Sequence, residues 1–461
     1  MSRPSLLWLR RDLRRSDHPA LVAAAASGPV LPVFVLDPEF LDPAGPVRRG
    51  WLAATLRALE ASYDGHLCLL RGDPRTVIPA LALEVGAREV HTSVETEPGG
   101  AARDAAVRAA LEAVGVAWVG TGSPYAVTPG RVRNAAGDGY RVFTPFLRAW
   151  RTHGWSDPAV EPDPLALTDA PSDASAWDAV DAALAACPIE LPPAGQEAAL
   201  ARWEEFRSTE LAHYDEHRDL PALDGTSRLS AYLKFGVLHP RTLLADLAGR
   251  QGDGAQRFIT ELAWREFYAD VLHHHPGSLA SDLNPLEVAY DEPDARFEAW
   301  REGRTGYPIV DAGMRQLLAS GWIHNRVRMI TASFLTKDLH VWWPHGAEHF
   351  LAHLIDGDLA SNSHGWQWVA GTGTDAAPYY RVFNPISQGE RFDPDGEYVR
   401  RWIPELAHLA GAAAHRPWQV PDGYAHGYPV RIVDHAAERV EALARYERAR
   451  LSRSDHARRH L

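Results

Sequence analysis

Short apolar runs alternate with amphipathic segments through the first part of the chain. Residues 5–9 (SLLWL) and 30–37 (VLPVFVLD) have the composition of buried strands. Short apolar strands that alternate with helices indicate a parallel sheet covered on both faces. We therefore predict an α/β domain over residues 1–130 with a five-stranded, Rossmann-like parallel sheet, although no GxGxxG sequence follows the first strand. The other strands are expected at 66–72, 88–93 and 116–120, and the helices at 18–27, 46–62, 74–85 and 101–114.

The pattern changes after residue 130. Residues 155–200 are rich in Pro, Asp and Ala and show poor periodicity, so we interpret residues 131–200 as a long interdomain linker that wraps the surface. From about residue 200, apolar residues recur at helical spacing, which predicts an all-α domain over residues 201–461. Its expected helices are 197–216, 239–250, 255–275, 308–320, 322–337, 346–355 and 432–451.

Composition narrows the class of protein. The 461 residues suffice for two or three domains, and 46% of them are hydrophobic, which is ordinary for a globular protein. No apolar stretch reaches the roughly 18 residues of a membrane span. The apolar run at the N-terminus is too short for a signal peptide, and its charges follow it. Only Cys68 and Cys187 are present, so we expect neither a disulfide framework nor a CxxC metal site, and we expect a cytoplasmic protein.

The net charge and the tryptophan content are two further features that bear on function. The net charge of -13 argues against a chain-wide electrostatic grip on nucleic acid, although it allows a local basic patch. The chain has 16 tryptophans, which cluster after Trp264. Because an indole has a large ring and an N–H that both need partners, this cluster calls for an explanation.

Polar, small and indole side chains crowd together in residues 356–375, DGDLASNSHGWQWVAGTGTD. Asp356 and Asp358 lack a third or fourth ligand nearby in the sequence, so we interpret them as acceptors for the N–H and hydroxyl groups of a ligand and expect no metal site. Asn362 follows, and then Trp366 and Trp368. If the segment is irregular or extended, these two indoles reach different surroundings.

Three earlier motifs each have a plain structural reading and a functional one. Residues 225–236 (GTSRLSAYLKFG) can cradle a phosphate, but the motif alone favours a simple helix cap at Thr226 or Ser227. Residues 261–272 (ELAWREFYADVL) place Glu261, Arg265 and Tyr268 on one helical face, beside Trp264 and Phe267. This face suits either a base edge or an ordinary ion pair.

The third motif is GWIHNRVRMITASF, residues 321–334. Asn325, Arg328 and Met329 share a face of the expected helix, and an amide there suits a base or ring edge. Arg328 can pair with Asp356 across helices. We interpret His324 as a helix-packing residue.

These motifs, with GRTGYPIVDAGMRQL, DAAPYYRVFNP, QGERFD and the N-terminal WLRRDLRRSDHPAL, resemble the DNA photolyase/cryptochrome family over essentially the whole chain. They are most similar to the bacterial class I photolyases that repair cyclobutane pyrimidine dimers. The resemblance implies an α/β antenna domain, a helical domain that holds FAD, and a carbon–carbon lyase that repairs UV-damaged DNA, single- or double-stranded, with light. It implies a monomer with no obligate protein partner and no membrane association.

The resemblance also implies roles for individual residues. Asn362 would face flavin N5, and Trp366, Trp343 and Trp300 would form an electron-transfer chain that ends at the surface with Trp300, with Trp342 as a possible substitute in the middle. The cofactor contacts would be Tyr214, Thr226, Ser227, Arg228, Leu229, Ser230, Arg265, Arg328, Asp356, Gly357, Asp358 and Asn362. The dimer contacts would be Glu261, Trp264, Asn325, Met329 and Trp368, and the DNA-backbone contacts Arg218, Arg326 and Gln388.

A second, antenna chromophore is expected at Arg48, Glu95, Glu97 and Lys234. The resemblance favours 8-hydroxy-deazaflavin over methenyltetrahydrofolate, although Glu95 stands where a deazaflavin binder usually has Asp. The chain also departs from its relatives at Ser363 and His364. His324-Asn325 and Met329 favour dimer repair over repair of (6-4) lesions. The alternatives are a cryptochrome-type photoreceptor without repair activity and, with little support, a light-independent flavin oxidoreductase.

Overall fold

The computed structural model describes residues 3–375 and 380–459, with side chains described as far as residue 451. Residues 376–379, within the DAAPYYRVFNP motif, lie outside the described residues. The chain forms two compact units. Unit 1 comprises Met1–Ala212, Ser227–Pro276 and Ile355–Asp358, and unit 2 comprises His213–Thr226, Gly277–Leu354 and Leu359–Leu461.

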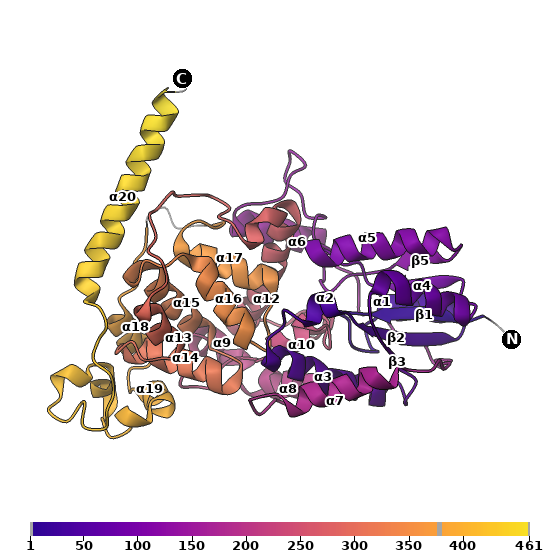
Figure 1. Cartoon of the computed structure of the whole chain (residues 1–461), viewed down its shortest axis with the longest axis horizontal. Coiled ribbons are helices and arrows are strands. Elements are labelled where there is room, and N and C mark those ends of the chain that lie inside the picture. Colours follow the sequence, from indigo (N-terminus) through magenta and orange to yellow (C-terminus); the bar gives the residue numbers. More distant parts are fainter. Residues whose placement is uncertain (1–2, 376–379, 460–461) are drawn as a thin grey trace. The chain divides into compact units, whose positions relative to one another are not determined.

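Unit 1 contains the predicted five-stranded parallel sheet, in the order β3-β2-β1-β4-β5 (Figure 1). Each strand lies within two residues of its expected bounds, because short segments that contain apolar residues lie between polar loops. The α/β prediction is therefore confirmed. The strands are β1 (Ser5–Leu9), β2 (Val30–Leu36), β3 (Cys68–Arg71), β4 (Glu89–Thr92) and β5 (Ala117–Gly120).

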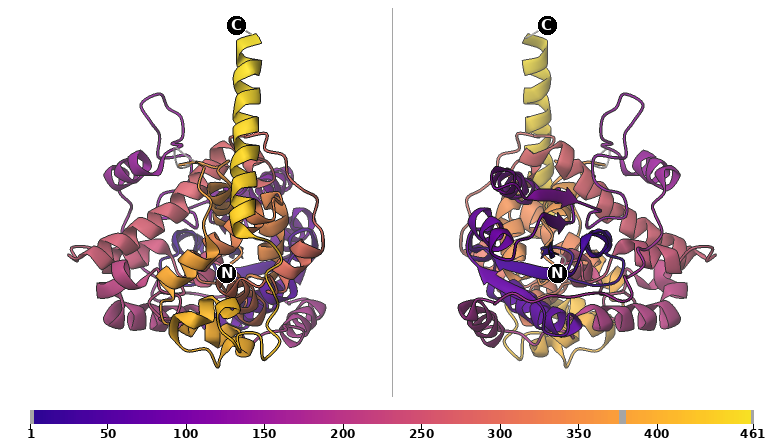
Figure 2. Two further views of the ribbon diagram at one scale, coloured as in Figure 1. Left: turned by 90° about the vertical axis from the view of Figure 1, so that its left-hand side faces the viewer. Right: turned by 90° about the vertical axis from the view of Figure 1, so that its right-hand side faces the viewer.

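Helices cover both faces of this sheet (Figure 2). Helices α4 (Pro74–Glu84) and α5 (Pro98–Ala113) pack together over one face, where Leu81 and Leu111 join a core with Trp8. Helix α1 (Pro19–Ser27) packs against β1 and β4, and α3 (Pro46–Ser62) follows β2. All four helices begin with a proline, which suits the first helical turn because its missing N–H has no partner there anyway.

Helix α7 (Ala174–Ala185) lies inside the segment that we expected to be irregular. It packs against α3 and β3, as Figure 1 shows for its neighbour α3. Its buried positions are Ala176 and Val180, so its apolar face is narrow and made of small residues. An alanine-rich helix of this kind has little contrast between its faces, and this explains why the periodicity did not reveal it.

The rest of the chain is helical, as predicted. The long, yellow α20 (His435–Arg459) continues beyond the expected end at residue 451 (Figure 2). The other α-helices are α2 (Pro38–Leu41), α6 (Phe143–His153), α8 (Gln196–Thr209), α9 (Tyr214–His217), α10 (Ser230–Lys234), α11 (Pro240–Asp246), α12 (Asp253–His274), α13 (Ala295–Arg301), α14 (Pro308–Ser320), α15 (Asn325–Ser333), α16 (Trp343–His353), α17 (Leu359–Ala370), α18 (Pro385–Phe392) and α19 (Glu397–Trp402). A π-helix, η3 (Phe334–Asp338), extends α15, and 3-10 turns lie at η1 (Leu211–His213), η2 (Pro276–Leu279), η4 (Pro404–Leu406), η5 (Gly411–His415) and η6 (Pro417–Gln419).

Two general classes of site receive no support from the described residues. None of their helices combines the length and the apolar composition that a bilayer-spanning segment needs. Nor do they contain a group of three or more His, Cys, Asp or Glu side chains that could hold a metal ion.

Candidate functional site

The stretch after Asp358 is a regular helix, α17, and is neither irregular nor extended. In an α-helix, positions two residues apart point about 200° away from each other. Trp366 and Trp368 therefore reach different surroundings from a regular helix. Trp366 is buried, whereas Trp368 is half-buried and lines a small hollow with Val369, Tyr380 and Phe383.

Asn362 lies one helical turn before Trp366, on the same face of α17. Its side-chain Nδ2 donates to the carbonyl oxygen of Ala347 on α16 at 3.0 Å. Because a carbonyl can only accept, this bond fixes which end of the amide faces α16. The Asn362 carbonyl oxygen is thereby turned away from Ala347 and is placed to accept a hydrogen bond from a ligand N–H.

The two departures from the family pattern face into unit 2. The ring of His364 is completely buried, with Nδ1 2.9 Å from the Ala360 carbonyl and Nε2 3.0 Å from Ser278 Oγ. Ser363 Oγ donates to the carbonyl of Leu279 at 3.2 Å. These side chains fasten α17 to η2.

Trp366 packs closely between helices of unit 2. Its ring centroid is 5.0 Å from Phe350 and 6.1 Å from Trp300. Gly346 on α16 makes this packing possible, since a Cβ at that position would lie 2.2 Å from Cη2 of Trp366. The indole is therefore held in one orientation against the backbone of α16.

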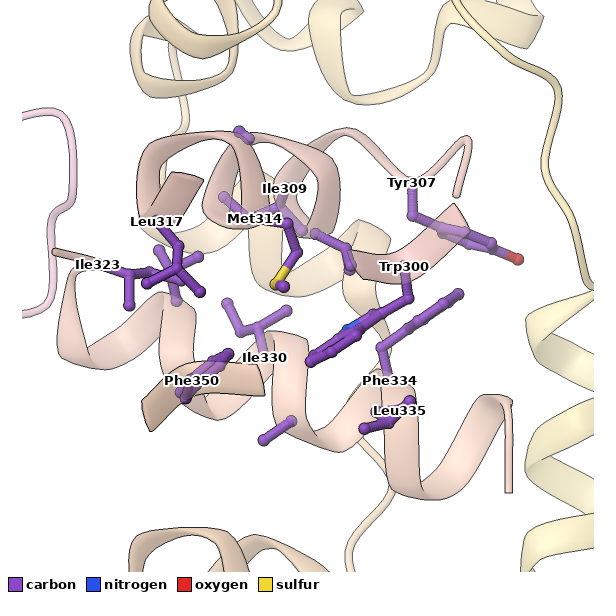
Figure 3. Close-up of a cluster of buried hydrophobic side chains, with 14 of the residues drawn as sticks. Trp300, Tyr307, Ile309, Met314, Leu317, Ile323, Ile330, Phe334, Leu335 and Phe350 are labelled. Carbon is purple, nitrogen blue, oxygen red and sulfur yellow. The ribbon is translucent and has the colours of Figure 1, made fainter. Parts of the chain in front are cut away.

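Trp300 does not end at the surface, which corrects our prediction. Its side chain has no exposed area and lies inside the hydrophobic core of unit 2, among Ile330, Phe334 and Leu335 (Figure 3). Its Nε1 donates to the Thr331 carbonyl at 3.0 Å. The sequence alone did not reveal whether the Trp300 side chain, on α13, faces the core or the solvent.

Trp343 is also fully buried, and its ring centroid is 6.4 Å from that of half-buried Trp342. Of the two neighbouring indoles, Trp342 is thus the more exposed. In the described part of unit 2, the indoles thus form two neighbouring pairs, Trp366 with Trp300 and Trp343 with Trp342, and Trp342 is the one of these four that reaches solvent.

Helix α12 in unit 1 presents Glu261, Trp264, Arg265 and Tyr268 on one half-exposed face, whereas Phe267 is buried. The ring of Trp264 stacks on Phe143, with centroids 3.6 Å apart and planes 8° from parallel. Glu261 Oε1 is 3.4 Å from Nε of Arg257. One face of the indole is thus covered by Phe143, while Phe267 and Tyr268 lie beside the ring, and the side chain stays half-exposed.

The predicted phosphate loop lies at the start of α10. Arg228 has a left-handed backbone with φ of 53°, which turns the chain sharply, and the next residue, Leu229, is anchored in the core. Ser230 and the side chain of Arg228 are exposed, and Ser227 is half-buried with its carbonyl bonded to Arg202 Nε at 3.0 Å. Hydroxyls and a cation on a sharply turned loop form a donor set that suits phosphate.

Three of the four predicted antenna residues, Glu95, Glu97 and Lys234, meet Asp358 in a buried ion cluster centred on Arg11. We define the Arg11 cluster as Arg11, Glu95, Glu97, Lys234 and Asp358. Arg11 lies 2.5 Å from Glu97, 3.5 Å from Glu95 and 3.2 Å from Asp358, and Lys234 Nζ lies 3.2 Å from Glu97 and 3.6 Å from Asp358.

Opposing effects set the charges in the Arg11 cluster. Burial disfavours the charged guanidinium, but Glu97 and the other carboxylates outweigh it, so the pKa of Arg11 stays well above its usual value. Burial likewise raises and Arg11 lowers the pKa of Glu95, with a net lowering. Burial lowers the pKa of Arg48, and Glu97 partly counteracts this effect. The pKa shifts of Arg11 and Glu95 both favour the charged forms of these groups.

Arg11 was not among our predicted site residues. It follows β1, and Glu95 and Glu97 follow the neighbouring strand β4, so the carboxyl ends of two adjacent parallel strands bring them together. Ligands of open α/β sheets bind at this edge. Charged residues directly after each buried strand were the signal that could have revealed Arg11.

The predicted DNA contacts in unit 2 gather around Asp219. Arg326 Nη2 bonds to Asp219 Oδ2 at 2.7 Å, and Arg218 Nε lies 3.7 Å from Asp219 Oδ1. The Arg326 guanidinium also stacks over Phe392 at 4.5 Å, on the helix that carries Gln388. Two of the predicted DNA-backbone contacts, Arg218 and Arg326, thus lie beside the same carboxylate.

Helix α15 places Asn325 and Met329 one turn apart, exposed and half-buried respectively. Arg328 Nε donates to the carbonyl of Ile323 at 2.8 Å. His324 is buried and caps the helix by accepting from Arg326 N at 3.2 Å. This agrees with the helix-packing role that we expected for His324.

The donor set fits FAD. The turned loop with Ser227, Arg228 and Ser230 suits a diphosphate, the carboxylates of Asp356 and Asp358 suit ring and hydroxyl donors, and Asn362 offers an acceptor. The predicted cofactor residues come from both units.

Known proteins are similar to this chain over nearly its whole length. A family model for DNA photolyase matches residues 5–165, and one for the FAD binding domain of DNA photolyase matches residues 258–448. The deoxyribodipyrimidine photo-lyase of Halobacterium salinarum is 40% identical and covers 96% of this chain and 99% of its own. A bacterial class III photolyase structure from Agrobacterium tumefaciens has a TM-score of 0.89 at 37% identity, with 98% of both chains covered. The Synechocystis sp. PCC6803 cryptochrome has a TM-score of 0.85 at 28% identity, with 96% of this chain and 98% of its own covered. The α/β part and the helical part match these two models in order, and relatives are about 40% identical over nearly the full length. The chain therefore belongs to the DNA photolyase family.

Proposed function

We propose that this chain is a deoxyribodipyrimidine photo-lyase, which uses light and reduced FAD to split cyclobutane pyrimidine dimers in single- or double-stranded DNA. The observation that carries the proposal is the half-exposed face of α12, on which the Glu261 carboxylate lies about one turn before the half-exposed Trp264 ring. An acid and an aromatic plane are what a flipped-out pair of pyrimidines requires. The residues 1–130 would form the antenna domain, 131–200 the linker and 201–461 the catalytic domain.

In this proposal, different residues bind the flavin and the lesion. Bound FAD supplies a light-excited electron donor. Asp356, Asp358 and Asn362 orient its ring, and Trp264 and Trp368 stack on the flipped dimer. We assign to Glu261 the contact with the pyrimidine carbonyl on which negative charge develops. Flipping costs a few kcal/mol and least for a poorly stacked lesion, which favours damaged sites.

The second candidate is a cryptochrome-type photoreceptor, favoured by the structural similarity to the Synechocystis cryptochrome. Glu261, Trp264, Asn325, Met329 and Trp368 are all present, and we assign them to the lesion, so repair is our conclusion. Relatives named deoxyribodipyrimidine photo-lyase support this choice.

Illumination of the reduced holoprotein with dimer-containing oligonucleotide is expected to restore intact pyrimidines. The Glu261→Ala variant should retain FAD but repair fewer dimers per absorbed photon, by about 10-fold to 100-fold if one charge-stabilising contact is lost. The matched control is Arg257→Ala, which removes the partner of Glu261 on α12. Dimers that persist in the wild type under blue light would overturn the function, and an unchanged yield in Glu261→Ala would overturn the role of this acid.

We further propose 8-hydroxy-deazaflavin as the antenna chromophore, in preference to methenyltetrahydrofolate. Lys234 and Arg48 are cations beside Glu97 in unit 1, and an acidic phenol would bind next to such cations. Mass spectrometry of the chromophore released from protein purified from its own host should detect a deazaflavin. A folate in its place would contradict this assignment.

A further inference from the structure

A carboxylate is bonded to the indole N–H of Trp343. Trp343 begins α16 and has no exposed area, and its Nε1 lies 2.7 Å from Oδ1 of Asp282. Asp282 is half-buried, so one end of its carboxylate is in contact with the protein interior. Trp300 belongs to the same hydrophobic core, but its indole N–H is bonded to the neutral carbonyl of Thr331.

The residues before and after Asp282 are fastened to α17. Gln367 Nε2 donates to the Ser278 carbonyl at 2.6 Å, and Leu283 N donates to Gln367 Oε1 at 2.8 Å. His364 and Ser363 add bonds to Ser278 and Leu279. The loop therefore has little freedom, and its carboxylate is held at the indole.

A neutral acceptor is enough to satisfy a buried indole N–H. The use of a carboxylate, Asp282, as the acceptor therefore calls for a separate explanation. An indole that loses an electron becomes a cation, and a positively charged ring releases its N–H proton readily. A carboxylate within hydrogen-bond distance both stabilises that cation and can take the proton. Asp282 also faces Tyr290, whose pKa is raised mainly by burial and further by this carboxylate.

We propose that Asp282 is the proton acceptor for Trp343 when this residue passes an electron toward the flavin. The inference rests on the proposed function. The electron leaves Trp343 to fill the vacancy on Trp366 that the light-driven reduction of FAD creates. The Nε1–H bond of Trp343 then breaks and its proton forms an O–H bond on Asp282, which leaves a neutral indolyl radical and a neutral carboxylic acid. Loss of charge on both partners slows the return of the electron.

The chain offers a matched control for the carboxylate. In unit 1, the fully buried Trp203 donates its Nε1 to Asp246 Oδ2 at the same 2.7 Å. Trp203 is not part of the proposed electron chain. The variants Asp282→Asn and Asp246→Asn therefore make the same chemical change at equivalent bonds, and only the first should alter the photochemistry.

Flash photolysis of the full-length holoprotein tests the proposal. In the wild type, the tryptophan cation radical should convert to the neutral radical, with a solvent isotope effect in D2O. In Asp282→Asn the cation should persist roughly 100-fold longer, the lower end of what a positioned general base contributes. Asp282→Glu should restore the conversion, and Asp246→Asn should behave as wild type. Asp282→Ser is a second variant without the carboxylate if Asp282→Asn does not fold.

An independent measurement uses protein labelled with 15N at its indoles. The Trp343 N–H resonance should move in Asp282→Asn, and the Trp203 resonance in Asp246→Asn. Conversion to the neutral radical at the same rate in Asp282→Asn and Asp246→Asn overturns this inference and leaves the proposed function intact. A wild-type holoprotein that forms no tryptophan radical after the flash also overturns this inference, whereas the proposed function is overturned separately, by dimers that persist when the reduced holoprotein is illuminated.

Discussion

The Trp366→Phe variant is expected to bind FAD normally and to lose nearly all light-driven reduction of the flavin. Trp366 is buried on α17, one turn after Asn362, and it is packed against Trp300 and Phe350. Phenylalanine fills much of the same space, but its ring is far harder to oxidise than an indole. We expect the reduction rate to fall by about 100-fold or more, equivalent to roughly 2.7 kcal/mol in the barrier.

Absorbance of the flavin under continuous blue light, with an external reductant, measures this rate. Trp368→Phe is the matched control, because Trp368 lies two residues further along the same helix and points away from Trp366. It should leave reduction unchanged and weaken binding of damaged DNA. A Trp366→Phe protein that reduces its flavin at the wild-type rate would remove this residue from the electron chain.

The second large effect is expected in unit 1, where Arg11→Met should lower the free energy of unfolding by about 3–5 kcal/mol. This substitution keeps the length of the side chain but leaves Glu95, Glu97 and Asp358 with Lys234 as the remaining cation of the Arg11 cluster. Buried carboxylates without a partner are costly. Affinity for FAD should also fall, because Asp358 loses one of the groups that hold it.

Urea unfolding of the holoprotein measures the change. Arg57→Met is the control, since Arg57 pairs with Asp181 on the surface, where the side chains are 40% and 59% exposed. A surface pair contributes about 0–1 kcal/mol. Equal losses in the two variants would show that the Arg11 cluster does not stabilise the fold.

Much of the fold was predictable because local patterns report it. Apolar runs between polar loops located all five strands, and helical spacing located α12, α14 and α20. Helix α7 was not predicted, because its many alanines leave little difference in hydrophobicity between its buried and exposed faces. The polar stretch of α17 misled us about its local structure, since its buried face is lined by Ser363, His364 and Gln367 as well as by apolar groups.

The candidate site was predictable in composition but not in its contacts. The face of α12 follows directly from residue spacing, and the motifs identify residues such as Asn362. The bond between Trp343 and Asp282 joins residues 61 positions apart, and that between Arg11 and Asp358 joins residues 347 apart. Such pairings depend on tertiary packing. The burial of Trp300 is of the same kind, because it depends on how α13 lies against the core.

The contact between Gly346 and Trp366 limits which residues can replace this glycine. Glycine inside a helix is less favourable than alanine by roughly 0.5–1 kcal/mol, so mutational drift toward alanine would ordinarily be tolerated or welcome. At this position the added methyl group would meet the Trp366 ring. An alanine that would suit an isolated helix would here overlap the Trp366 ring and Leu335. Purifying selection at position 346 would then report the position of the Trp366 indole together with the packing of the core.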